Sequence, residues 1–212
     1  MEVYSTEEQQ VEAIKRFLRE NGLSIVAGIV LGLGGLYGYR HYQATQLEAA
    51  EAHSTGYSNL TQVLTDEKAD KSAFTADAQK FIDANKESSY SALAALLSAK
   101  ELVAAKDYAA AEKQLSWVVA NHKEAELVAV AQLRLARVQA EQKKYPDALK
   151  TLGATMPAAF ASQQAELKGD VLAASGDAAG AKAAYKAAKA ASGTEQNPLL
   201  DVKLNELAHV AG

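Results

Sequence analysis

The longest uninterrupted run of apolar positions covers residues 23–39, LSIVAGIVLGLGGLYGY, where seventeen successive residues carry no charge. At about 1.5 Å per residue, a helix of this length covers roughly 26 Å, at the short end of the range for crossing a bilayer. We therefore predict a transmembrane signal-anchor helix over residues 23–42. Tyrosines cluster at its far end, as aromatic rings do at the depth of lipid headgroups: Tyr37, Tyr39 and Tyr42.

Two alternatives to a retained anchor stay open. The run could be a buried core helix, although such helices rarely carry so long an uncharged stretch between charged ends. It could also be a cleavable signal peptide, which requires a small-x-small cleavage site close behind a short apolar core. The nearest such site, residues 50–52, lies more than ten residues beyond the run. A retained anchor fits the length and the flanks best.

Beyond the apolar run, apolar positions follow the 3.6-residue period of helices, and the alternating patterns of strands are nearly missing. Residues 43–65 are predicted to be helical, and a polar, charged break follows at residues 66–72. A helix over residues 124–142 has two apolar faces, which is typical of a helix packed between two neighbours. One face comprises Leu127, Ala131, Leu135 and Val138, and the other Ala129, Leu133, Ala136 and Ala140.

An internal repeat becomes visible in the second half of the chain. Tyr108, Tyr145 and Ala178 occupy equivalent places, 37 and then 33 residues apart. This spacing predicts tetratricopeptide repeats, in which antiparallel helix pairs have small residues where their backbones cross and bulky residues beside each crossing. Three positions later each copy has a small residue: Ala111, Ala148 and Ala181. Four positions after those come the larger residues Leu115, Leu152 and Tyr185. The third copy also has a glycine, Gly169, at its helix crossing.

The predicted fold class is therefore all-α, with one transmembrane helix followed by a helical solenoid. We divide the chain into a tail (residues 1–22), the span (23–42) and a repeat domain (43–212). Asn197 and Pro198 are the N-cap and first position expected of a terminal helix that covers the last repeat. An all-α bundle of helical hairpins without true repeats remains the alternative.

The charges that flank the span predict its orientation. Lys15, Arg16 and Arg19 precede it, whereas Arg40 is the only Lys or Arg after it until Lys68. Because basic residues stay on the cytoplasmic side, the N-terminus is expected in the cytoplasm. In a bacterium, the protein would then be a single-pass inner-membrane protein with residues 43–212 in the periplasm.

Two sets of residues are candidates for contacts. Gly28, Gly32 and Gly35 share one face of the span, where they would let another membrane helix approach, although glycine is also simply common in membrane helices. Four charged residues are placed by the repeat pattern on first helices, towards the concave surface of the array, where they would contact peptides or remain solvated: Lys100, Arg137, Glu166 and Asp170.

Composition and motifs exclude most chemistry. A net charge of −4 with 23% charged residues gives no electrostatic case for nucleic acid, and the absence of cysteine removes thiolate sites. The sequence contains no HExxH, phosphate-binding loop or nucleophile elbow, so we predict no catalytic, cofactor or metal-binding residues and no enzyme. The four histidines are scattered and are expected at surfaces or helix ends: His41, His53, His122 and His209.

Three stretches carry a resemblance to a known family. VEAIKRFLRENG at residues 11–22, LRLARVQ at 133–139 and DALKTL at 147–152 resemble the YfgM-like proteins. These are single-span inner-membrane proteins with a tetratricopeptide-like periplasmic domain. The resemblance covers the whole chain in layout and is close only in those stretches.

The resemblance implies a role as an ancillary subunit of the SecYEG translocon that works with the membrane-anchored chaperone PpiD on emerging proteins. A second role implied by the family is restraint of an envelope stress response through a cytoplasmic response regulator bound to the tail. An oligomeric scaffold for envelope assembly is a third hypothesis. In all three the protein is a membrane-tethered interaction module.

Overall fold

The structure, a computed structural model, describes residues 7–65, 73–193 and 197–209. These residues form helices and no strand, which confirms the all-α prediction. They divide into two units, residues 1–52 and 53–212. The helices are α1 (Glu7–Thr65), α2 (Phe74–Ala84), α3 (Ser89–Ala104), α4 (Tyr108–Asn121), α5 (Ala125–Glu141), α6 (Tyr145–Leu152), the 3-10 turn η1 (Ala158–Phe160), α7 (Ala161–Ala174), α8 (Ala178–Ala191) and α9 (Pro198–Glu206).

Helix α1 supplies the whole described part of the first unit. It continues without interruption through the predicted tail and span, and its last residues, from His53 to Thr65, belong to the second unit. Part of the predicted tail, residues 1–6, and the predicted break at 66–72 lie outside the described residues.

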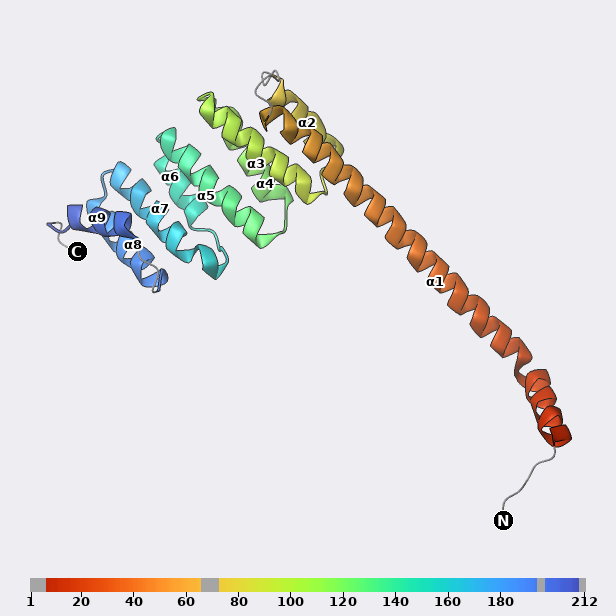
Figure 1. The fold of residues 1–212 in the computed structure, drawn as a ribbon. Helices are drawn as coiled ribbons and strands as arrows, with labels where there is room; N and C mark the ends of the chain where they lie inside the picture. Colours follow the sequence, from red (N-terminus) through yellow and green to blue (C-terminus); the bar gives the residue numbers. More distant parts are fainter. Residues whose placement is uncertain (1–6, 66–72, 194–196, 210–212) are drawn as a thin grey trace, which may run out of the picture. The chain divides into compact units, whose positions relative to one another are not determined.

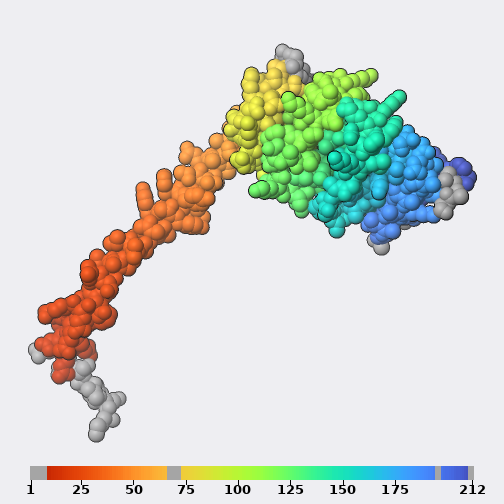
Figure 2. Space-filling model, turned by 180° about the vertical axis from the view of Figure 1, so that it is seen from behind, coloured from red at the N-terminus to blue at the C-terminus, as the bar shows by residue number. Residues whose placement is uncertain are grey.

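The second unit is a row of helical hairpins, visible in Figure 1 as the green to blue part of the ribbon. Helices α3 and α4, α5 and α6, and α7 and α8 form three successive pairs, and each pair contacts the next. In Figure 2 the atoms of this unit follow one another across the surface in order of sequence, as expected of an array in which each repeat contacts its neighbours. The repeat prediction is confirmed.

The three hairpins have the same turn. Lys106, Lys143 and Gly176 take left-handed backbone conformations, with φ of 61°, 59° and 92°. The next residue in each turn donates its backbone N–H to the carbonyl five residues earlier, over 2.9 Å in all three copies, which is the longer hydrogen bond of a Schellman motif. The repeat therefore extends to the hydrogen bonds that end each first helix.

Helix α5 packs on both sides, as its two predicted faces require. Leu127, Ala131, Leu135 and Val138 join the core that α5 shares with α3 and α4. Leu133, Ala136 and Ala140 join a separate core with α6 and α7. Since each core includes residues of neighbouring hairpins, no single hairpin accounts for the burial of its apolar residues.

A further helix pair precedes the three predicted repeats. The end of α1 packs on α2, where the Phe81 ring lies over Gly56: a Cβ on this glycine would come within 2.8 Å of Phe81 Cε2. Leu60, Phe74 and Ile82 form the first part of the core beside this contact. The sequence pattern predicted a helix over residues 43–65 but did not indicate its partner.

Helix α9 closes the other end of the row. The Asn197 side chain accepts a hydrogen bond from the Leu200 N–H over 3.1 Å, and Pro198 follows as the first helical residue, which confirms the predicted cap. Leu200 is buried with Tyr185 and Ala188 of α8. The terminal helix thus covers the apolar end of the last hairpin.

Candidate functional site

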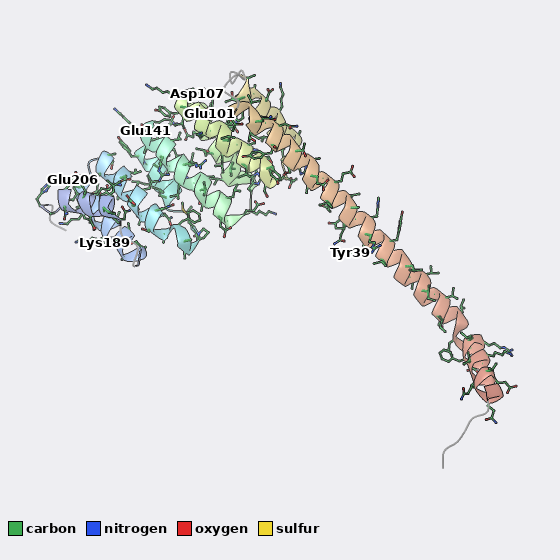
Figure 3. The ribbon with its side chains drawn as sticks, viewed as in Figure 1. Tyr39, Glu101, Asp107, Glu141, Lys189 and Glu206 are labelled. Atoms are coloured by element: carbon green, nitrogen blue, oxygen red, sulfur yellow. The ribbon has the colours of Figure 1, made fainter. Side chains whose placement is uncertain are left out.

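No residue that the structure describes buries the apolar run in the first unit. Within the described residues, α1 is the one helix long and apolar enough to cross a membrane, and no part of its apolar window is buried. Leu31, near the middle of the run, is 76% exposed, and the Tyr39 side chain (Figure 3) is exposed as well, although its hydroxyl accepts a hydrogen bond from Gln43 of the same helix. Exposed apolar area on this scale is unfavourable in water and favourable in lipid.

The glycine face of the span is equally open. A Cβ built on Gly28, Gly32 or Gly35 meets no described atom within 4 Å. None of the three glycines is therefore required by packing within this chain. A second helix could approach their backbones closely, which is the condition for van der Waals association in a membrane.

In the second unit, equivalent positions of successive first helices carry charges. We call Lys100, Arg137, Asp170 and Lys203 the column residues; they lie on α3, α5, α7 and α9, spaced by 37, 33 and 33 residues. Lys100 and Arg137 line one crevice, Arg137 and Asp170 line a second, and Asp170 forms an ion pair with Lys203. Each crevice between neighbouring first helices is therefore bordered by two members of the column.

The α3–α5 crevice is the most apolar of these hollows. It has a volume of about 230 Å³, and Lys100 and Arg137 both contribute to its wall. Arg134 is a third cation at the same crevice, and its guanidinium lies 3.5 Å from the Leu96 carbonyl oxygen. The remaining lining residues are apolar: Ala99, Val103, Leu115 and Val138.

The α5–α7 crevice has a mixed border. Arg137 and Asp170 both line it, together with Glu141 and Lys143, and Leu167 and Val171 contribute apolar surface. Opposite charges here balance one another in number. This crevice repeats the α3–α5 crevice one hairpin later, with a different charge pattern.

Between α7 and α9, ion pairs join the charged residues. The Lys203 ammonium lies 2.7 Å from an Asp170 carboxylate oxygen and 2.8 Å from a Glu166 carboxylate oxygen. Asn197 also donates to Glu166, over 3.0 Å. Two of the four predicted surface residues, Glu166 and Asp170, thus hold α9 on the last hairpin, whereas Lys100 and Arg137 line an open crevice.

The contacts between α7, α8 and α9 determine the protonation states of Lys203 and Tyr185. Burial lowers the pKa of Lys203, but hydrogen bonds to Asp170 and Glu166 outweigh this effect and raise it overall. Burial raises the pKa of the Tyr185 hydroxyl, and its 2.9 Å hydrogen bond to Asp170 raises it further. Lys203 is therefore charged and Tyr185 neutral at physiological pH, which keeps the network intact.

His122 differs from the expectation of a surface histidine. It follows the last residue of α4, and its N–H donates to the Val118 carbonyl, as predicted for a helix end. Its side chain, however, is only 4% exposed and lies edge-on against Trp117, with ring centroids 5.1 Å apart. The burial of the His122 ring against Trp117 could not be predicted from the sequence, because it depends on how α4 turns back towards α5.

No group of three or more potential metal ligands occurs among the residues that the structure describes. The described residues instead present three surfaces suited to binding: an exposed apolar helix, its glycine face, and the crevices between first helices.

Comparisons with known proteins agree with this picture. A family model described as a tetratricopeptide repeat-like domain matches residues 15–209. An Escherichia coli K12 protein named ancillary SecYEG translocon subunit is 36% identical over 209 residues, 98% of this chain and 100% of that protein. The chain belongs to this family.

Other ancillary SecYEG translocon subunits are similar over most of their length. The Haemophilus influenzae protein is 32% identical over 202 residues, 95% of this chain and 97% of its own, and the Neisseria gonorrhoeae protein is 32% identical over 174 residues, 82% and 83%. No solved structure matches the chain. The family is one of interaction proteins and not of enzymes, as the sequence predicted.

Sequence reasoning missed Lys203 and Arg134. Lys203 continues the column by the same 33-residue step, so the repeat spacing could have found it. Arg134 has no equivalent in the column, and only the packing of α3 against α5 brings it to the crevice.

Proposed function

We propose that this protein is an ancillary subunit of the SecYEG translocon, anchored in the bacterial inner membrane by residues 23–42. The N-terminus faces the cytoplasm and the repeat domain the periplasm. The observation that carries the proposal is an uncovered apolar helix joined to an interaction fold, in a chain similar over nearly its full length to proteins named for this role.

The repeat domain would work at the periplasmic side of the channel, with the membrane-anchored chaperone PpiD, on proteins that emerge there. Tethering supports such a role physically. A span beside the channel raises the effective concentration of the repeat surfaces near emerging chains, so weak contacts suffice. The open glycine face at Gly28, Gly32 and Gly35 is the proposed contact with a neighbouring membrane helix.

Site-specific photocrosslinking tests the proposal in native membranes. A crosslinker replaces Leu31 in the span of the full chain, and a second variant carries it at Lys113, an exposed residue of α4. We expect crosslinks from residue 31 to SecY, SecE or SecG. If residue 31 reaches no translocon component, the proposal is wrong.

Topology is tested separately by adding protease outside the inner membrane of spheroplasts. We expect digestion of the repeat domain while the tail stays protected. Protection of the repeat domain until the membrane is lysed would reverse the proposed orientation.

A second candidate function is a regulatory tether whose cytoplasmic tail restrains a response regulator. The observation that favours it is the exposed apolar side of α1 before the span, where Ile14 and Phe17 are 60% and 58% exposed. Deletion of residues 2–10 separates the two functions. Loss of stress-response control with normal export would support the tether, and impaired export with normal control would contradict it.

A further inference from the structure

The column residues allow a comparison between two pairs of equivalent positions, one joined by an ion pair and one without it. Between α7 and α9, Asp170 and Lys203 have opposite charges and form an ion pair of 2.7 Å. The Lys203 side chain is 20% exposed there and the Asp170 side chain 40% exposed. The charges of Asp170 and Lys203 are therefore paired within the chain.

Between α3 and α5 the same two positions carry like charges. Lys100 and Arg137 repel each other, and Arg134 adds a third cation to the crevice. Among the described residues, no carboxylate forms an ion pair with Arg134 or Arg137. Lys100 has one weak contact, 3.6 Å to Glu101, between side chains that are 71% and 32% exposed, and such surface pairs contribute little.

The floor of this crevice is aliphatic. Val103, Leu115 and Val138 line it together with Ala99, and the hollow of about 230 Å³ is large enough for an aliphatic side chain. Phosphate or another small anion would neutralise the cations but would make no contact with the apolar floor. A polypeptide can satisfy both, with a carboxylate beside an apolar side chain.

We propose that the α3–α5 crevice binds a polypeptide segment that pairs an aspartate or glutamate with an adjacent aliphatic residue. The carboxylate lies between Lys100 and Arg137, where it accepts hydrogen bonds from both, and the aliphatic side chain rests on Val103 and Val138. The carboxylate then forms ion pairs with Lys100 and Arg137, as Lys203 does with Asp170. The inference rests on the proposed function, because the segment belongs to a polypeptide emerging at the export site.

Arginine suits this role, since its planar guanidinium can hold a carboxylate through two parallel hydrogen bonds. The α5–α7 crevice is not expected to bind the same segment. Asp170 and Glu141 at its border would repel an incoming carboxylate. Selectivity between the crevices therefore comes from the charged residues at their borders.

The test uses the full chain in nanodiscs and two fluorescein-labelled peptides, one with a Leu-Glu-Leu core and one with Leu-Gln-Leu. Fluorescence anisotropy gives Kd for each. We expect the glutamate peptide to bind about tenfold more tightly than the glutamine peptide at low salt. Equal affinity for the two peptides would overturn the proposal.

Variants locate the binding site. Arg137→Gln and Lys100→Gln are each expected to weaken the glutamate peptide about tenfold and the glutamine peptide hardly at all. Lys113→Gln, which removes an exposed cation of α4 outside the crevice, is the matched control and should change neither Kd. Equal losses for Lys113→Gln and Arg137→Gln would show non-specific attraction and overturn the site. Circular dichroism confirms that each variant is folded.

The outcome is separable from that of the proposed function. If residue 31 crosslinks to the translocon but the peptides do not discriminate, the crevice inference fails and the proposed function stands. If the peptides discriminate and the span reaches no translocon component, the translocon role fails and the crevice remains a binding site for acidic, aliphatic segments.

Discussion

The ring of Tyr185 on α8 lies directly over Gly169 on α7. A Cβ on Gly169 would overlap the ring atoms Cδ1 and Cε1 of Tyr185. At the equivalent crossings of the other two hairpins, alanine takes the place of Gly169, at Ala99 and Ala136, and leucine takes the place of Tyr185. Glycine and tyrosine therefore form a matched pair, in which the absent methyl group makes room for the larger ring.

We expect Gly169→Ala to lower the free energy of unfolding by about 1–3 kcal/mol, because the overlap outweighs the gain in helix propensity. Adding Tyr185→Leu reproduces the alanine–leucine pair of the other hairpins and should recover part of the loss. Urea unfolding followed by the fluorescence of Trp117, the one tryptophan, measures both. If the double variant is no more stable than Gly169→Ala, the two residues are not a matched pair.

The left-handed turns give a second prediction. Lys106 and Lys143 hold positive φ values that cost a residue with a Cβ about 1 kcal/mol, whereas Gly176 takes its φ of 92° without that cost. Lys143→Gly should raise the free energy of unfolding by up to about 1 kcal/mol, and Gly176→Ala should lower it by about the same amount. The same urea titration applies, and a destabilised Lys143→Gly would contradict the backbone argument.

Loss of Lys203 should release α9. Lys203→Met leaves Glu166 and Asp170 close together without their cation, and we expect a loss of about 2 kcal/mol in the free energy of unfolding. Lys189→Met is the control, since the Lys189–Asp201 pair labelled in part in Figure 3 is exposed and should contribute less than about 1 kcal/mol. Limited proteolysis should cut Lys203→Met before α9 and leave the control intact.

The same lysine sets a dependence on alkaline pH. Its pKa in the folded protein is raised above 10.5, so its contribution to stability is fully present below that value and is lost as pH rises through the folded pKa. Wild type should therefore lose stability in strong alkali more steeply than Lys203→Met. Parallel slopes in unfolding curves recorded across this range would contradict the assignment.

Glu112 sets the corresponding dependence on acid. Burial raises the pKa of this carboxyl, but hydrogen bonds from Lys144, Gln142 and Gln139 outweigh burial and lower it below 4.5. Its contribution is present above 4.5 and is lost as pH falls through the folded pKa. Glu112→Gln should cost about 2 kcal/mol at pH 7 and flatten the acid side of the stability profile, as read by thermal unfolding.

The proposed span predicts a further result. Leu31→Arg places a charge at the centre of residues 23–39, which costs about 3 kcal/mol on insertion scales. We expect a larger fraction of the protein to be extracted by alkaline carbonate, whereas Leu31→Ile should stay in the membrane pellet. Equal retention of both variants would argue against a transmembrane position.

Local periodicity in the sequence determined much of the architecture. The apolar run, the two faces of α5 and the cap at Asn197 follow from residues near one another in the sequence, and the hairpin spacing follows from the internal repeat. Helix type and apolar face are local properties, so they could be predicted. The pair formed by α1 and α2 was hidden, because the connector at residues 66–72 is longer than the short turns of the later repeats.

Tertiary structure alone decided which charges meet. Glu166, Asp170 and Lys203 are separated along the chain, and only the packing of α9 on the last hairpin makes them a closed network. The equivalent residues Lys100 and Arg137 cannot form an ion pair with each other, because packing places two cations at the same crevice. The sequence specified the positions of these charges along each helix, but ion pairing depends on distances of a few ångströms between helices, which the linear pattern does not contain.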